Sequence, residues 1–143
     1  MPNPNDLVFV DANIPMYAAG APHALKGPCV AILAAIARGG MAAVTDAEVI
    51  QELLHRYTAL GDRGRSVELA RLFARVVPDV LAVGRSEMLS AIALHERHSR
   101  LTARDSVHLA VMQRHGIVRL LSADRHFDAV PGIVRIDPAA WAA

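Results

Sequence analysis

Five short apolar runs rich in Val, Leu and Ile alternate along this chain with segments of helical pattern. The runs cover residues 7–10, 41–44, 80–83, 118–121 and 133–136, and each is bounded by residues that end strands. Strands that alternate with helices in this way form parallel sheets with helices on both faces. The sequence therefore predicts an α/β fold in which helices flank a parallel five-stranded sheet.

The length of 143 residues suits one domain, residues 1–143, with a core of ordinary size. The longest apolar stretch, residues 29–37, is too short to cross a membrane, and the first residues lack the basic start of a signal peptide. A single cysteine, Cys29, excludes an internal disulfide and a cysteine metal cluster. We expect a cytoplasmic protein without membrane contact. The hydrophobic content of 53% points to an apolar surface that a partner covers.

Capping signals place two helices. Thr45 and Glu48 have the spacing of a capping box ahead of an apolar stripe, and Thr102 and Asp105 have the same spacing ahead of a second helix. Gly116 follows the last turn of that second helix as a C-terminal cap. We therefore expect helices that begin just after Thr45 and just after Thr102.

Carboxylates follow two of the expected strands. Asp11 comes directly after the run 7–10, and Asp124 lies three residues beyond the run 118–121. Ligand sites in parallel sheets form at the carboxyl ends of the strands. Each acid alone is also explained by a turn or a helix cap. Together, converging acids repel one another unless a cation lies between them, which favours a Mg²⁺ or Mn²⁺ site and chemistry on phosphates.

Two helical acids are further candidates for this site. Glu52 lies roughly 120° from the centre of the apolar stripe of its helix, and Glu48 lies roughly 160° from it. Glu52 is therefore nearer the buried face and is the better candidate. Asp105 can cap its helix, but it shares a face with the packed residues His108 and Leu109, so its charge needs compensation. Asp128 is an alternative or additional acid near Asp124.

Arginine supplies 14 of the 15 basic residues, and Lys26 is the only lysine. Arginine binds phosphate through two hydrogen bonds, which is compatible with a nucleic-acid partner. The candidates for holding its backbone are Arg63, Arg65, Arg104 and Arg125. Other chemistries lack their motifs, because the chain has no glycine-rich phosphate loop, no nucleophile elbow and no histidine pair with metal-ligand spacing. His108 reads as a packed helix residue close to Asp105.

Four motifs in order resemble those of the PIN-domain nucleases, and in size the chain is similar to the VapC toxins of bacterial type II toxin–antitoxin pairs. The resemblance spans residues 7–136. Its motifs are Asp11-x-Asn13, Thr45 with Glu52, the segment 104–110 (RDSVHLA) and the segment 122–127 (SADRHF). Ser122 stands where threonine is common in the family.

The resemblance implies a three-layer PIN-like fold and an endoribonuclease that uses one or two Mg²⁺ or Mn²⁺ ions. Asp11, Glu52, Asp105 and Asp124 would be the catalytic, metal-binding acids, with Asn13, Thr45 and Ser122 as supporting polar residues. It also implies a homodimer, and a small cognate antitoxin, VapB-like, whose C-terminal segment occupies the groove near the acids.

Three alternatives stay open. A phosphoacceptor protein pairs its aspartate with a lysine after a late strand, but Lys26 lies in an early loop and Asp11-x-Asn13 lacks a second aspartate. A catalytically silent PIN-like binding module would keep the fold without the activity. A DNA nuclease, or an RNA-processing nuclease outside any toxin–antitoxin pair, would keep the same acids.

Overall fold

The computed structural model describes residues 6–141. Its centre is a five-stranded parallel sheet with the strand order β3-β2-β1-β4-β5. The strands are β1 (Val8–Val10), β2 (Ala43–Asp46), β3 (Val80–Leu81), β4 (Arg119–Leu121) and β5 (Val134–Ile136). The α/β fold and all five expected strands are confirmed.

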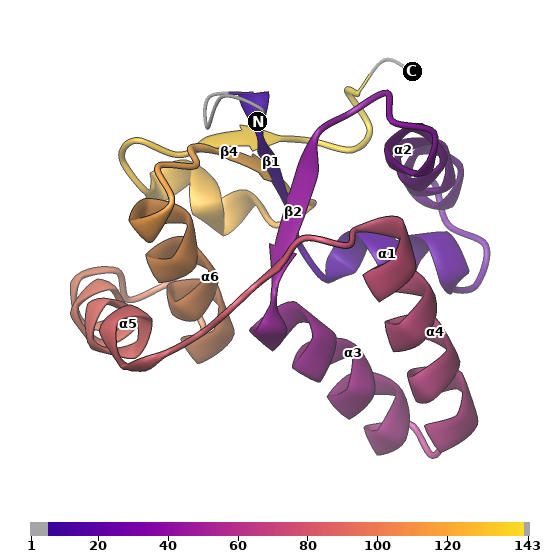
Figure 1. Ribbon diagram of the computed structural model, residues 1–143, viewed down its shortest axis with the longest axis horizontal. Helices are drawn as coiled ribbons and strands as arrows, with labels where there is room; N and C mark the ends of the chain where they lie inside the picture. Colours follow the sequence, from indigo (N-terminus) through magenta and orange to yellow (C-terminus); the bar gives the residue numbers. More distant parts are fainter. Residues whose placement is uncertain (1–5, 142–143) are drawn as a thin grey trace.

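The helices cover both faces of the sheet. Two helices follow each of the first three strands. They are α1 (Asn13–Ala19) and α2 (Lys26–Ala37) after β1, α3 (Ala47–Ala59) and α4 (Arg63–Val76) after β2, and α5 (Arg85–Arg97) and α6 (Ala103–Arg114) after β3. The 3-10 helix η2 (Arg125–Ala129) follows β4. Figure 1 shows α5 and α6 on one side of the sheet and α1, α2 and α4 on the other. Connections between parallel strands are right-handed. Helices in connections that run toward one edge of the sheet therefore cover one face, and helices in connections that run toward the other edge cover the other face.

The strand order reverses between β1 and β4, the two neighbours at the centre of the sheet. Val10 pairs with Leu121 in the parallel register, and the Asp11 amide donates to the Leu121 carbonyl at 3.0 Å. Open α/β sheets form their ligand crevice at such a reversal, outside the carboxyl ends of the strands. The fold therefore brings Asp11 and the segment after Leu121 to one edge.

The core encloses β1, β4 and helix α6. The three residues of β1 are at most 1% exposed, and α6 is buried continuously from Asp105 to Met112. Eight consecutive residues make more than two helical turns, so α6 is enclosed on every side. A polar side chain on α6 therefore has to find its partners in the interior. Within residues 6–141, no helix is both long and apolar enough to cross a membrane.

The expected capping box at Thr45 and Glu48 is wrong, and the reason is the length of β2. The strand continues to Asp46, so Thr45 is still in the sheet, where its hydroxyl donates to the Val10 carbonyl at 3.0 Å. Asp46 caps α3 instead, accepting from the Val49 amide at 2.9 Å. The capping box of Thr102 and Asp105 at the start of α6 is confirmed.

Candidate active site

The four acids singled out in the sequence line one cavity of about 580 Å³ at the carboxyl edge of the sheet. Asp11 follows β1, Glu52 lies on α3, Asp105 on α6, and Asp124 directly before η2. The structure thus brings together four segments that are far apart in the sequence. The other lining residues are Asn13, Met16, Tyr17, Gly20, Ala21, Arg56, Tyr57 and Leu60.

Asp11 is the most enclosed of the four acids, at 4% exposure. The Ser122 hydroxyl donates to its Oδ2 at 2.7 Å, Asn13 Nδ2 donates to the same oxygen at 3.2 Å, and the Ala12 amide donates to Oδ1 at 2.8 Å. Burial nevertheless raises the pKa of Asp11 to about 6, although His108 and the Ser122 hydrogen bond act in the opposite direction. A carboxylate in this position gains free energy from a nearby cation.

Asn13 and Ser122 connect the ends of β1 and β4. The Asn13 amide nitrogen lies 2.9 Å from Ser122 Oγ and 3.4 Å from Asp124 Oδ2, and its oxygen accepts from the Ala123 amide at 3.2 Å. Ser122 Oγ in turn accepts from the Asp124 amide at 3.1 Å. These bonds fix Asp11 and Asp124 relative to each other. Thr45 supports the same edge indirectly, through the carbonyl of the residue before Asp11.

Asp105 forms a second group with Asp124 and His126. Its Oδ2 accepts from the Thr102 amide at 3.0 Å and lies 2.8 Å from His126 Nε2. One ligating atom from each of the three side chains lies within 4.8 Å of the others. His126 is not among the site residues expected from the sequence. The sequence relates His126 to the acids only through its position two residues after Asp124. Its partner Asp105 lies on another helix, so no local pattern connects the two residues.

A buried histidine lies behind the acids. His108 Nδ1 is 2.8 Å from Asp46 Oδ2, whereas its Nε2 is 3.9 Å from Asp11 Oδ1 and 3.8 Å from Glu52 Oε2. Burial alone lowers the pKa of His108, but the Asp46 hydrogen bond and the nearby carboxylates of Glu52 and Asp11 outweigh it and raise the pKa to about 10. The expectation that His108 is a packed helix residue is confirmed, but its hydrogen-bond partner is Asp46, which is not among the residues expected at the site.

The donor set fits a divalent cation. Carboxylate oxygens of Asp11 and Glu52 lie within 4.8 Å of each other, and such oxygens are the ligands that Mg²⁺ and Mn²⁺ prefer, whereas the protonated His108 beside them has no free lone pair for a metal. Glu52 Oε2 and His108 Nε2 are buried and, among the described residues, have no hydrogen-bond partner. A buried carboxylate oxygen left without a donor is costly, and a bound cation would satisfy it.

The remaining candidates lie outside this cavity. Asp128 is exposed and paired with Arg135 at 2.8 and 3.2 Å, and this pairing lowers its pKa. Arg104 contacts Glu48 at 3.5 Å, and Arg65 donates to the Ala19 carbonyl. Arg63 and Arg125 are exposed. None of the four candidate arginines lines the cavity, whereas Arg56, which is not among those candidates, does.

Some known proteins are similar to this chain in sequence, and others have a similar fold. The PIN domain model matches residues 8–133. Ribonuclease VapC13 of Mycobacterium tuberculosis is 42% identical over 130 residues, which cover 91% of this chain and 99% of that protein. The crystal structure of M. tuberculosis VapC20, a sarcin-ricin loop cleaving toxin, superposes with a TM-score of 0.71 at 22% identity and covers 85% of this chain and 93% of its own. A toxin–antitoxin complex from Klebsiella pneumoniae superposes with a TM-score of 0.65 at 16% identity, covering 92% and 97%.

The family model spans most of the chain, and the VapC relative matches it almost from end to end. The chain therefore belongs to the PIN-domain family, among the VapC ribonucleases.

Proposed function

We propose that this protein is a metal-dependent endoribonuclease that hydrolyses RNA phosphodiester bonds and acts as the toxin of a toxin–antitoxin pair. The observation that carries the proposal is the convergence of Asp11, Glu52, Asp105 and Asp124 on one cavity at the reversal of the strand order. The names of the VapC relatives and the toxin–antitoxin complex among similar folds support the choice of RNA and of an antitoxin.

The cofactor in this proposal is Mg²⁺ or Mn²⁺, as one or two ions held by the four acids. When bound, such an ion would lower the pKa of a water molecule and offset negative charge on the phosphate. Asn13 and Ser122 keep Asp11 and Asp124 in place before RNA arrives. Arg56 lines the same cavity and supplies a positive charge that a phosphate oxygen can meet.

The antitoxin in this proposal is a small VapB-like protein whose C-terminal segment enters the acid-lined cavity. Basic side chains of that segment would offset the charge of the same carboxylates and exclude RNA. RNA and such an antitoxin share the cytoplasm, which we propose as the site of action.

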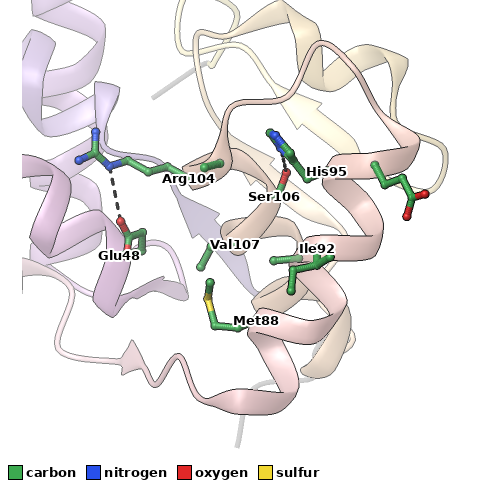
Figure 2. A pocket seen from close by; sticks show the side chains of 10 residues that line it. Glu48, Met88, Ile92, His95, Arg104, Ser106 and Val107 are labelled. Carbon is green, nitrogen blue, oxygen red and sulfur yellow. Dashed lines mark hydrogen bonds and ion pairs between the residues drawn. The ribbon is translucent and has the colours of Figure 1, made fainter.

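A homodimer also belongs to the proposal, and the groove between α5 and α6 is the surface we assign to it. Figure 2 shows Met88, Ile92 and Val107 around this groove, with the ion pair of Arg104 and Glu48 at its edge. The groove has a volume of about 580 Å³, and Met88 and Ile92 are 44% and 62% exposed. A second copy of the chain would remove this apolar surface from water.

Incubation of purified protein with total cellular RNA tests the activity. Discrete fragments are expected with Mn²⁺ or Mg²⁺ and no cleavage with EDTA. Asp11→Asn should lower the rate by about 100-fold or more, because it removes an anionic ligand. Asp128→Asn makes the same carboxylate-to-amide change outside the cavity and should cleave like the wild type.

Other outcomes would favour the alternatives. Cleavage that persists in EDTA would contradict the metal-dependent mechanism. A folded chain that neither cleaves RNA nor binds Mn²⁺ would be a silent binding module. Faster cleavage of single-stranded DNA than of RNA, measured in parallel, would identify a DNA nuclease.

A further inference from the structure

A second, smaller hollow lies next to the acid-lined cavity. It has a volume of about 200 Å³ and forms where the connection between α5 and α6 meets η2. We call it the basic hollow, and its lining residues are Arg97, His98, Ser99, Arg100, Leu101, His126, Ala129 and Val130. The buried side chains of Leu101 and Val130 give it an apolar floor.

Every ionisable side chain in this lining is an arginine or a histidine, and none is a carboxylate. Arg97 and Arg100 are exposed, and within residues 6–141 neither forms an ion pair. Arg104 contacts Glu48 and Arg135 contacts Asp128, so their guanidinium groups are already paired, unlike those of Arg97 and Arg100 and of most other arginines. The guanidinium groups of the basic hollow are thus available to an anion from outside.

His126 joins the basic hollow to the acids. Its ring lines the hollow, and its Nε2 lies 2.8 Å from Asp105 Oδ2 in the acid cluster. The basic hollow therefore adjoins the acid-lined cavity at His126. A chain of repeating negative charges that reaches the acids on this side meets Arg97 and Arg100 next.

We propose that the basic hollow binds a backbone phosphate of the RNA substrate, next to the phosphate that is cleaved. The inference rests on the proposed function, because its ligand is the RNA strand itself. Four carboxylates repel a polyanion, so binding needs compensating positive charge beside them. Arginine forms paired hydrogen bonds with phosphate oxygens and is the side chain best suited to this role. The Ser99 hydroxyl is a further donor in the same lining.

The test is the binding of a fluorescent single-stranded RNA of mixed sequence to the full-length chain, measured by anisotropy at several salt concentrations. All proteins carry Asp11→Asn, so that the RNA is not cleaved. The double variant Arg97→Ala/Arg100→Ala is expected to weaken binding about tenfold and to reduce the slope of log affinity against log salt by about one.

The matched control is Arg71→Ala/Arg75→Ala. These two exposed arginines lie on α4, on the opposite face of the sheet from α5 and α6 (Figure 1), and their removal changes the net charge equally. The control is expected to bind RNA within about twofold of its parent. Thermal unfolding of both double variants checks that each is folded.

A second probe asks whether the ligand is a backbone phosphate. RNA strands in which single phosphates are replaced by neutral methylphosphonates should include one position that weakens binding to the parent but not to Arg97→Ala/Arg100→Ala. Equal weakening by both double variants, or by neither, would overturn the proposal. If the wild type cleaves RNA but Arg97→Ala/Arg100→Ala binds RNA as tightly as its parent, the proposal for the basic hollow is wrong and the proposed function stands. If the wild type neither cleaves nor binds RNA, the proposed function is wrong as well.

Discussion

At the scale of single residues, the candidate site contains buried charged side chains that depend on one another, among them Asp11, Asp46 and His108. Asp46 and His108 are at most 1% exposed, and their contact holds the imidazole facing Asp11 and Glu52. The pKa of Asp11 is about 6 and that of His108 about 10, so the metal-free site carries one buried cation beside acids that it only partly neutralises. Removing one of these side chains changes the free-energy cost of keeping the others charged inside the protein.

The raised pKa of Asp11 predicts a specific pH dependence of stability in EDTA. Because the folded state binds this proton more tightly than the unfolded state, the stabilising contribution is fully present below pH 3.8 and is lost as pH rises through about 6. The side-chain amide introduced by Asp11→Asn does not titrate, so this variant should gain stability relative to the wild type by an amount on the order of 3 kcal/mol between pH 4 and pH 7. Urea unfolding of both proteins at each pH measures it.

Manganese provides the control for this prediction. A cation beside Asp11 offsets the cost of its buried charge, so Mn²⁺ at pH 7 should stabilise the wild type and leave Asp11→Asn nearly unchanged. A stability difference between the two proteins that stays constant with pH in EDTA would contradict the raised pKa of Asp11.

At the scale of elements, helix α6 carries its site acid in its own capping box. Thr102 Oγ1 accepts from the Asp105 amide at 3.1 Å, and Asp105 Oδ2 accepts from the Thr102 amide at 3.0 Å. The cap therefore fixes the first turn of the helix and the Asp105 carboxylate together. Thr102→Ala should lower the free energy of unfolding by about 1 kcal/mol and weaken Mn²⁺ binding several-fold.

Asp62→Ala is the control for this change. Asp62 caps α4, accepting from the Arg65 amide at 3.0 Å, and α4 carries none of the four site acids. This variant should lose a similar amount of stability and keep its Mn²⁺ affinity. Unfolding by urea and titration by electron paramagnetic resonance give both quantities. Equal loss of Mn²⁺ affinity in the two variants would mean that α6 has no special role in placing Asp105.

At the scale of the whole molecule, the sequence predicts what depends on repeating patterns and misses what depends on contacts between distant segments. Apolar runs bounded by turn residues predict all five strands, and the rule for carboxyl ends of parallel strands brings Asp11 and Asp124 into one cavity. Asp46 reads as an ordinary residue next to Thr45, because its partner His108 is 62 positions away. Arg56 and His126 have no local pattern that separates them from other polar residues.

The same scale includes the surface that a second copy would cover. Ile92→Asp places a charge in the lining of the apolar groove between α5 and α6, and burying an unpaired carboxylate in an interface costs several kcal/mol. Sedimentation should therefore show a dimer for the wild type and a monomer for Ile92→Asp. Leu72→Asp makes a matched change on α4, since Leu72 is 54% exposed and Ile92 is 62% exposed, and this variant should stay dimeric. A monomer from Leu72→Asp with a dimer from Ile92→Asp would move the interface to the groove between α2 and α4, because Leu72 lines that groove.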